Sequence, residues 1–589
     1  MGFNKELADI LENIAALQEL TGADPFRAVS NARAARIIAD HPTDLSTIAH
    51  DRDALVAING VGEKIADKIL EYAEHGRIKE YEALLKKVPP GLPPLLDIPG
   101  LGPKTARVLW TQGNIESLDD LKNAIASGAI LKLPRMGKKT VENISAAIQF
   151  REQAGDRALL GEALHIALDI VERLKKVKGV KRVEYAGSLR RGRETIGDID
   201  ILVAAEGAAA EKAAETFRTL PSVQKVLAAG DTKSSVRLHP EGAHPIQADL
   251  RVIPPDSFGA ALLYFTGSKD HNVSLRQRAL KAGYTLNEYG LFPEDDETTP
   301  PQSRNVKPVA SKSEEDIYNA LDLPFIPPEL RENQGELDFP KSHDFNLISL
   351  SDIRAELHAH TTASDGKLSI DELVEAAKAR GFHTIAITDH SKSQTIANGL
   401  SPDRLRQHVD DIHAARKRHK GITILAGTEV DILPDGSLDY DDDLLSLLDV
   451  VVASPHTSLK QSPDKATERL LSAIKHPLVH IIGHPCGRYV NRREGLSPDI
   501  PTLSRAAAKH HTALEINANH LRLDLRDSHA RAALAENALL AIDCDVHNPD
   551  NFNELTFGVL TARRAGCTPD QCINAWPARK LHDWLKSKR

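Results

Sequence analysis

The sequence lacks any uninterrupted apolar run near the roughly 20 residues that a membrane-spanning helix requires. Its first residues, MGFNKELADI, contain no secretory apolar stretch. Cysteine is also scarce, with 4 in 589 residues, which argues against a disulfide framework and indicates that the thiols stay reduced. We therefore expect a cytoplasmic protein.

A strong net charge is absent as well. Hydrophobic residues make up 41% of the chain and charged residues 27%, with a net charge of −9. This composition is typical of globular proteins, and the length suits roughly three to five domains. The acidic total does not exclude nucleic acid, because local sites decide binding. Histidine is unevenly spread: 17 of 25 lie at or after position 351, which points to metal chemistry there.

The expected secondary structure changes along the chain. Short amphipathic helices are expected up to about residue 155, followed by β-rich runs such as DIDILVAA and PIQADLRVI. A proline-rich polar stretch, residues 327–345, is the best linker candidate. Beyond it, strands such as TIAITDH and DVVVASPH alternate with helices. This alternation predicts a parallel α/β sheet or barrel with its active site at the carboxyl ends of the strands.

Three short repeats share one plan, in which an apolar residue precedes a glycine-containing hairpin and a helix start: INGVGEKIADKI (58–69), IPGLGPKTARVL (98–109) and LPRMGKKTVENI (133–144). Glycine permits the turn, and free backbone N–H groups at the helix start can hold phosphate. One copy could be a plain hairpin between helices, but three resemble helix-hairpin-helix motifs, which grip DNA phosphates. The third departs, with Arg135 in place of the first glycine. The expected DNA-binding residues are Gly60, Gly62, Lys64, Gly100, Gly102 and Lys104.

Two aspartates stand one residue apart in GDIDILVAA. On a strand, Asp198 and Asp200 point to the same side, so their charges repel unless a cation lies between them. Asp249 lies on another predicted strand, and the run AGSLRRG supplies a phosphate-binding turn followed by Arg191. This set suits two Mg²⁺ or Mn²⁺ ions around a nucleoside triphosphate. The alternative is a solvated edge strand that happens to carry acids.

Over roughly residues 1–320 the chain resembles a family X DNA polymerase, the group that contains DNA polymerase beta. The segments that carry the resemblance are GSLRRG, GDIDILV, ADLRVIP, YFTGSKDHNVSLR and LNEYGLF. The resemblance implies that Asp198, Asp200 and Asp249 bind the catalytic metals. It also implies that Tyr264 limits ribonucleotide entry, although Tyr264 and Phe265 could instead be a core aromatic pair. The implied nucleotide-binding set is Gly187, Ser188, Arg191, Tyr264, Phe265, Gly267, Asn272 and Arg276.

The amino-terminal block resembles the deoxyribose-phosphate lyase domain of the same family. Lys68 in GVGEKIADK falls at the position of the Schiff-base lysine. A lysine attacks an aldehyde only after losing its proton, so the reaction needs desolvation or nearby cations. Asp67 and Glu71 are its neighbours in sequence. A surface lysine without a catalytic role is the alternative.

A second cluster of metal-binding residue types begins at ELHAH, where His358 and His360 project together from a strand. Nine such groups exceed one tetrahedral site, so two or three Mn²⁺, Zn²⁺ or Fe²⁺ ions are expected. The pattern is similar to the PHP (polymerase and histidinol phosphatase) domain, a distorted (β/α)7 barrel that hydrolyses phosphoesters. The resemblance implies the ligands His358, His360, Asp365, His390, Glu429, His456, His484, Asp545 and His547. Asp389 is expected to orient a ligand, and Cys486 and Cys544 to pack in the core.

These features predict a multidomain α+β and α/β protein. The expected order is a lyase-like helical DNA-binding domain (1–88), a fingers-like helical domain (89–155), a nucleotidyltransferase palm (156–255), a thumb that binds the nascent base pair (256–325), a linker (326–350) and a PHP phosphoesterase domain (351–589).

The combination resembles a bacterial family X polymerase with a C-terminal PHP domain. It implies a monomeric repair enzyme that binds gapped or primer-template DNA and fills short gaps from deoxynucleoside triphosphates. The PHP site would act as a 3′–5′ exonuclease, an abasic-site endonuclease or a 3′-phosphoesterase. One alternative is a small-molecule phosphatase of histidinol-phosphatase type on a DNA-binding scaffold. Another is a tethering protein whose PHP domain is only structural.

Overall fold

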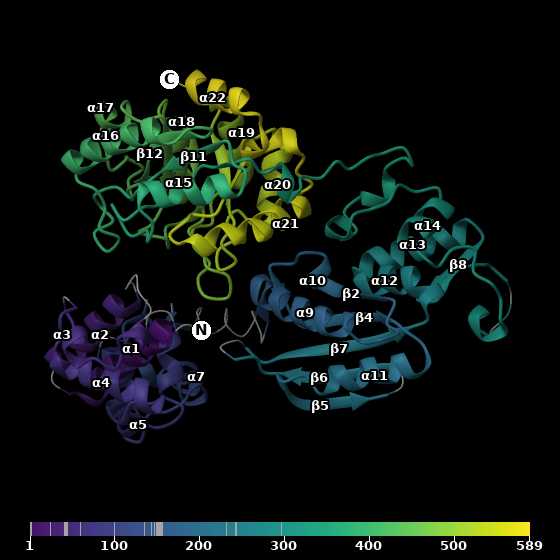
Figure 1. The fold of residues 1–589 in the computed structure, drawn as a ribbon, viewed down its shortest axis with the longest axis horizontal. Coiled ribbons are helices and arrows are strands. Elements are labelled where there is room, and N and C mark those ends of the chain that lie inside the picture. The colour runs from purple at the N-terminus through teal and green to yellow at the C-terminus, as the bar shows by residue number, and fades with distance from the viewer. Residues whose placement is uncertain are drawn as a thin grey trace. The chain divides into compact units, whose positions relative to one another are not determined.

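The computed structural model divides into two compact units, Met1–Gly155 and Asp156–Arg589 (Figure 1). It describes residues 3–588 except 24, 40–44, 59, 99, 100, 135, 139, 143, 146, 147, 149–156, 231, 242, 243, 296 and 298. Among these described residues, no helix combines the length and apolarity needed to cross a membrane.

The first unit is built from helices around a single apolar core. Helix α4 (Glu63–His75) shows how the sequence forms them: Ile65 and Ile69 lie buried on one face, and Gly76 ends the helix in the left-handed conformation. The other helices are α1 (Phe3–Thr21), α2 (Pro25–Ala39), α3 (Arg52–Val56), α5 (Lys79–Leu85), α6 (Pro103–Gly113) and α7 (Leu118–Ala126).

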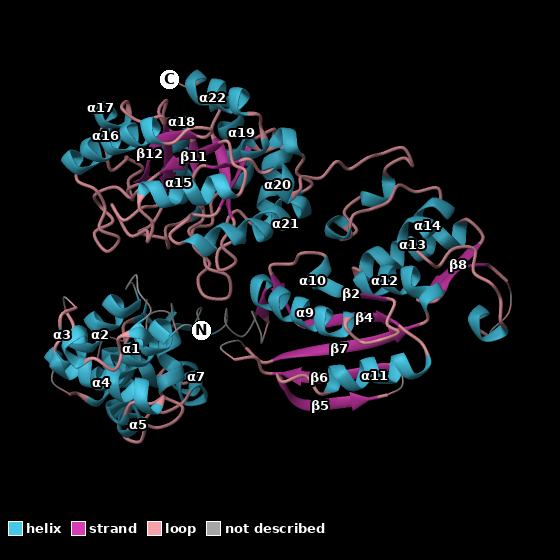
Figure 2. Ribbon diagram, in the orientation of Figure 1, coloured by secondary structure: helices cyan, strands magenta, loops and turns pink. Residues whose placement is uncertain are grey.

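The second unit begins with a five-stranded sheet of strand order β2-β4-β7-β6-β5. Helices α9 (Leu160–Lys175) and α11 (Gly207–Arg218) pack beside it (Figure 2), burying Phe217 against Ile199 and Ile201. The main strands are β2 (Arg182–Tyr185), β4 (Asp198–Ala204), β5 (Val223–Ala229), β6 (Lys233–Leu238) and β7 (Ile246–Ile253). Strand β1 (Ala158–Leu159) pairs with β3 (Thr195–Ile196), and α10 (Gly187–Arg190) follows β2.

A smaller helical layer follows the sheet. Its core joins Leu263, Leu275, Leu291 and Ile317, one from each successive element. The elements are α12 (Phe258–Thr266), α13 (Lys269–Lys281), the antiparallel pair β8 (Tyr284–Asn287) and β9 (Gly290–Pro293), and α14 (Glu314–Ala320).

The segment 326–350, which the sequence predicts as a linker, packs against this layer. Arg331 is fully buried, and its guanidinium lies over the rings of Tyr318 and Phe325. Arg331 Nη1 also donates to Glu314 Oε1 at 2.5 Å. We call residues 326–350 the connecting segment. Its buried ion pair anchors it to α14, so it is not a free tether.

Replacing Glu314 by glutamine should destabilise this layer. Burial would raise the pKa of Glu314, but Arg331 and Arg190 lower it to about 2. The carboxylate therefore contributes stability above its unfolded pKa of about 4.3, and this contribution is lost as the pH falls through about 2. Leaving Arg331 buried and unpaired costs about 3–5 kcal/mol. Thermal unfolding should show a lower midpoint at pH 7, with a smaller difference at pH 3; equal midpoints at pH 7 would contradict this.

The last part of the chain is a nearly closed barrel of seven parallel strands in sequential order, β10 to β16. An isolated bridge between Ala359 and Val546 brings its two edges together. The strands are β10 (Ala355–Glu356), β11 (Thr384–Ile387), β12 (Thr423–Asp431), β13 (Val450–Ser454), β14 (Ile481–Ile482), β15 (Ala513–Asn517) and β16 (Leu540–Asp543). The helices are α15 (Ile370–Ala379), α16 (Pro402–Arg418), α17 (Asp442–Leu445), α18 (Pro463–Lys475), α19 (Ile500–His510), α20 (Asp527–Ala535), α21 (Leu555–Ala565) and α22 (Ala578–Ser587). The predicted barrel is confirmed.

Candidate functional sites

The two aspartates of β4 meet the third acid on the neighbouring strand. Strands β4 and β7 are parallel, and Asp200 is paired directly with Asp249 in their register. Asp198, two residues earlier, shares the face of Asp200. Burial, Asp198 and Asp249 together raise the pKa of Asp200 to about 7. The three carboxylates therefore form one cluster that requires positive charge.

Lys233 supplies part of that charge and was not predicted from the sequence. Its Nζ lies 3.0 Å from Asp249 Oδ2, on the adjacent antiparallel strand β6. Burial would raise the pKa of Asp249, but hydrogen bonds from Ser235, Lys233 and Gln247 lower it. No local motif marks this lysine, because its pairing depends on the register of two strands.

The turn before α10 approaches the acid cluster closely. Gly187 has φ +64°, and a Cβ there would lie 2.5 Å from Asp200 Oδ2, so a side chain does not fit. Arg191, just beyond α10, donates from Nη1 to the carbonyl oxygen of Thr266 at 2.6 Å. Thus the two distant motifs GSLRRG and YFTGS, which contain Ser188 and Gly267, become neighbours in space.

The predicted aromatic pair, Tyr264 and Phe265, lies in the last turn of α12. The rings of Tyr264 and Phe265 meet edge to face with centroids 5.1 Å apart. A core pair would bury both rings, but Tyr264 is 36% exposed. Asn272 Nδ2 donates to the carbonyl oxygen of Tyr264 at 2.7 Å, and these residues line a small pocket together with Arg276. The exposure of Tyr264 and its place in this pocket favour a ligand-binding role over a core aromatic pair.

The predicted ligands of the second site gather at the carboxyl ends of the barrel strands, where α/β barrels place their active sites. His358 and His360 follow β10, with Asp365 in the next turn; His390 follows β11; Glu429 lies near the end of β12; His456 follows β13; His484 follows β14; and Asp545 and His547 follow β16.

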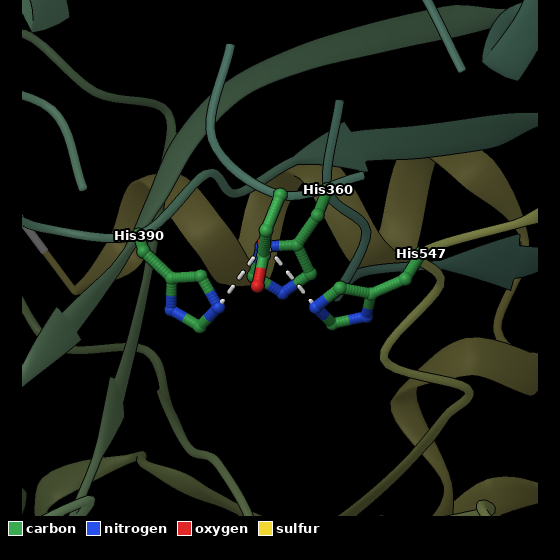
Figure 3. Close-up of side chains that lie close together, drawn as sticks. His360, His390 and His547 are labelled. Atoms are coloured by element: carbon green, nitrogen blue, oxygen red, sulfur yellow. Dashed lines mark ion pairs between the residues drawn. The ribbon is translucent and has the colours of Figure 1, made fainter. Parts of the chain in front are cut away.

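Three overlapping groups of these side chains offer atoms close enough to share metal ions: His360, Asp365, His390 and His547; His358, His360 and Asp545; and His390, Glu429 and His456. In the first group, Asp365 Oδ1 lies 3.5 Å from His390 Nε2 and 3.4 Å from His547 Nε2. Figure 3 shows the rings of His360, His390 and His547 converging, with dashed lines marking these ion pairs.

Glu429 links the remaining histidines. Its Oε2 lies 2.7 Å from His390 Nδ1, and its Oε1 lies 2.9 Å from His484 Nε2. The same Oε1 is 3.3 Å from His358 Nε2 and 3.4 Å from His456 Nε2. Asp545 Oδ1 lies 3.0 Å from His360 Nε2, so all nine predicted side chains, Asp545 included, form one continuous cluster.

The donor set of this cluster fits divalent metals. Several buried atoms, namely Nε2 of His358 and of His360, both carboxylate oxygens of Glu429 and Oδ1 of Asp545, find no hydrogen-bond partner within the described part of the chain. Leaving such atoms unpaired is costly. Imidazole nitrogens and carboxylate oxygens are ligands for Mn²⁺, Zn²⁺ and Fe²⁺. The residues can therefore hold a cluster of such ions.

A buried acid behind this cluster was missed by the sequence analysis. Glu515, on β15, lies with its Oε1 2.6 Å from His358 Nδ1, and both residues are fully buried. Its Oε2 accepts a hydrogen bond from the His484 backbone N–H at 2.5 Å. Glu515 in ALEIN could have been read as a strand-end acid, but its partner lies 157 residues away. This contact fixes which nitrogen of His358 faces the cluster.

Glu515→Gln should weaken metal binding at the barrel about 10–100-fold, the usual cost of losing such an orienting group. The amide is a poorer acceptor for the His358 N–H, so the imidazole becomes a weaker and less well-oriented ligand. Metal titration by calorimetry on the full chain gives the affinity. An unchanged affinity would show that Glu515 has only a packing role.

Asp389 takes the orienting position expected for it. Its Oδ1 accepts from the backbone N–H of Thr361 at 2.9 Å, and its Oδ2 lies 2.8 Å from His408 Nε2. It thus fixes the turn that leads to Asp365. Cys486 and Cys544 are buried in the barrel core.

The helical unit presents two of the three predicted hairpins. Gly60 has φ +93°, and a Cβ there would lie 2.3 Å from Ile37 Cδ1. Gly62 and Gly102 are the N-cap residues of α4 and α6. Glycine has no side chain to cap a helix, which leaves backbone N–H groups for an anion. Lys64 and Lys104 are exposed in the first turns. Gly100 and Arg135 lie outside the described residues.

Lys68 is held by residues far from it in sequence. Its Nζ lies 2.8 Å from Glu80 Oε2 and donates to Asn31 Oδ1 at 2.5 Å, and its side chain is only 13% exposed. The sequence neighbour Asp67 pairs with Arg52 instead. The lysine thus lies in a partly desolvated polar cluster rather than free on the surface.

Five family profiles match successive parts of the chain: helix-hairpin-helix domain (residues 3–78), SAM-like helix-hairpin-helix tandem (92–149), DNA polymerase beta palm (161–237), DNA polymerase beta thumb (261–332) and PHP domain (356–519). The palm match ends before Asp249 and the PHP match before Asp545 and His547, yet the structure brings these residues to the two acid clusters.

Three curated proteins are informative relatives. "DNA polymerase/3'-5' exonuclease PolX" of Bacillus subtilis is 38% identical over 582 residues, which cover 99% of both chains. "DNA polymerase lambda" of Rattus norvegicus is 26% identical over 56% of both chains. A "Probable phosphatase" of Edwardsiella ictaluri is 30% identical over 249 residues, which cover 40% of this chain and 94% of that protein.

Proposed function

Because this chain belongs to the PolX family, in which family X polymerase domains are followed by a PHP domain, we propose that it is a DNA-repair polymerase that also degrades DNA ends. The full-length match to a relative named for both activities supports this most directly. Two separate acid clusters, one on the palm sheet and one in the barrel, give each activity its own site.

At the palm, Asp198, Asp200 and Asp249 would hold two divalent ions, Mg²⁺ or Mn²⁺ in this proposal. When bound, such ions assist attack by the primer 3′-hydroxyl and departure of pyrophosphate. The chain itself orients the triphosphate through Ser188 and Arg191 and the sugar through Tyr264 and Phe265. The open edge of Tyr264 supports this role.

At the barrel, the nine clustered ligands would hold two or three ions, with Mn²⁺ proposed ahead of Zn²⁺ or Fe²⁺. These ions supply Lewis acidity and a nucleophilic water for phosphoester hydrolysis. The proposed reaction is 3′–5′ exonuclease cleavage; abasic-site endonuclease and 3′-phosphoesterase reactions use the same chemistry. Asp365 and His547, which are about one-third exposed, line the side open to solvent.

The phosphatase relative makes a small-molecule phosphatase the rival function. A 5′-labelled single-stranded oligonucleotide and histidinol phosphate, each offered with Mn²⁺, distinguish the two. We expect the oligonucleotide to be shortened stepwise and histidinol phosphate to be hydrolysed far more slowly. Efficient release of phosphate from histidinol phosphate with an intact oligonucleotide would favour the rival.

Lyase activity at Lys68 is a second proposal, supported by the partly buried position of its amine; the ion pair with Glu80 must open before the amine can lose its proton. Wild-type protein incubated with 5′-deoxyribose-phosphate DNA and borohydride should form a covalent adduct, and Lys68→Ala should not. Lys86→Ala, which removes an exposed lysine at the end of α5, is the control and should keep the adduct. Equal adduct formation by Lys68→Ala would remove Lys68 from the reaction.

The proposed substrates are gapped or primer-template DNA, gripped by the hairpins around Gly62 and Gly102, and deoxynucleoside triphosphates. We propose that the protein acts as a monomer in the cytoplasm. Sedimentation of the protein alone gives the oligomeric state.

A further inference from the structure

The loop that follows α10 in the palm lies against the PHP barrel. The backbone carbonyl of Arg191 accepts a hydrogen bond from Arg564 Nη1 of α21 at 2.7 Å. A Cβ on Gly192 would lie 3.3 Å from Leu560, also on α21. Glu194 Oε2 accepts from Arg488 Nη2 at 2.6 Å. The barrel therefore contacts three of the four residues from 191 to 194.

Apolar packing makes this contact part of the core. Leu523 and Phe557 of the barrel are buried in the same cluster as residues of the palm sheet and α9. A Cβ on Gly161 of α9 would lie 2.7 Å from the His520 ring, so α9 and the barrel approach closely. An interface with shared core residues fixes the loop geometry rather than merely tethering the domains.

The side chain of Arg191 is held by the same network. Its Nε donates to Glu332 Oε1 at 3.1 Å, and Arg564 Nη1 lies 2.9 Å from that oxygen. Arg564 is 3% exposed and is itself held by Asp527, with Nη2 2.8 Å from Oδ2. Positive and negative side chains alternate along this network, so each charge has a partner of opposite sign. The order is Arg191, Glu332, Arg564 and Asp527.

These contacts leave Arg191 able to bind a ligand. Its bonds to Glu332 and Thr266 use two of the five guanidinium N–H donors. An unrestrained arginine carries about 2 kcal/mol of rotamer entropy, much of which is lost on binding. A guanidinium that is already fixed avoids that loss when it meets a triphosphate.

We propose that Arg564, a residue of the PHP barrel, is a positioning residue of the polymerase site: through Glu332 and the Arg191 carbonyl it fixes the guanidinium that binds the incoming nucleotide's triphosphate. This inference rests on the proposed function, which assigns Arg191 to the triphosphate. It gives the barrel a part in nucleotide binding that is independent of its own metal cluster.

Arg563 on the same helix provides a matched control. Its Nε donates to Glu329 Oε1 at 2.7 Å, so it also ties α21 to the connecting segment. Among the described residues, its hydrogen bonds go to Glu329 and to the carbonyl oxygen of Ile348, not to Arg191 or Glu332. Arg563→Gln therefore removes a comparable interdomain ion pair without altering the contacts of Arg191.

The test measures single-nucleotide gap filling by the full chain over a range of deoxynucleoside triphosphate concentrations. We expect Arg564→Gln to raise KM for the nucleotide about tenfold, within the coupling found for members of one ion-pair network. Arg563→Gln should leave KM unchanged. In an Arg191→Ala background, Arg564→Gln should have no further effect, because Arg564 acts through Arg191.

Two further measurements check that the barrel is folded and that KM changes in the expected direction. Degradation of a labelled single strand by the barrel should be the same in Arg564→Gln and wild type, which shows that the barrel is folded. Glu332→Gln, a milder change, should also raise KM; a lower KM would show that Glu332 competes with the triphosphate and would overturn the proposal. So would equal KM values for Arg564→Gln and Arg563→Gln. If wild type incorporates no nucleotide at all, it is the proposed function that fails.

Discussion

Asp249→Ala should abolish nucleotide incorporation while DNA degradation continues at the wild-type rate. Asp249 lies in register with Asp200, and in the proposed function both carboxylates bind the cations at the palm. Metal assistance in such sites supplies several kcal/mol, so its loss should reduce the rate of incorporation at least about a thousandfold. Primer extension on a gapped duplex measures the rate.

The control for this variant is Asp169→Ala. Asp169 is a solvent-exposed acid of α9 that pairs with Arg173 one turn later. Its removal should leave both activities unchanged. If Asp249→Ala retained more than about a tenth of the wild-type rate, the third acid would not be a metal ligand and the palm assignment would be wrong.

The reciprocal variant, His358→Ala with His360→Ala, should abolish DNA degradation and leave gap filling largely intact. Both rings are fully buried and lie within 3.7 Å of Glu429 and Asp545. In the proposed function, removing both rings leaves too few ligands for a metal ion at these carboxylates. We expect at least a thousandfold loss of degradation, by the same reasoning as for the palm.

His413→Ala serves as the control for the double variant. His413 is an exposed histidine of α16, away from the strand ends that carry the ligands. It should keep full degradation. Persistence of degradation in the double histidine variant would instead show that the barrel cluster is not the hydrolytic site, and a tethering role for the barrel would then become the better account.

The sequence predicted which candidate ligands would lie together, because each motif carries its own geometry. Asp198 and Asp200 alternate on one strand, and His358 and His360 have the same spacing in the extended segment that follows β10, so each pair shares a face. The prediction of a parallel α/β sheet or barrel followed from the regular alternation of apolar runs and helices. In the barrel, the strand ends that meet in space are the ones that carry acids or imidazoles.

The supporting residues could not be predicted in the same way. Lys233 reaches Asp249 only through strand register, and Glu515 reaches His358 across 157 positions. Nothing in the local composition of either segment distinguishes these side chains from ordinary surface or strand residues. Such pairings depend on tertiary structure, which periodicity alone does not specify.

The connecting segment shows the limit of composition as a guide. Its prolines and charges are typical of a free linker. However, Arg331 finds Glu314 and two aromatic rings, while Glu332 finds Arg191 and Arg564. From sequence alone, a charged residue is expected to be exposed to solvent unless its partner is known. Here one partner of Glu332 lies 232 residues away in the sequence.

The central claim is that two separate metal sites in this chain lengthen and shorten DNA. The most direct test follows the length of one labelled primer. The primer is annealed in a gapped duplex and incubated with the protein and Mg²⁺ or Mn²⁺. With deoxynucleotides present it should grow to fill the gap, and without them it should shorten from its 3′ end. A primer that keeps its length under both conditions would contradict the account.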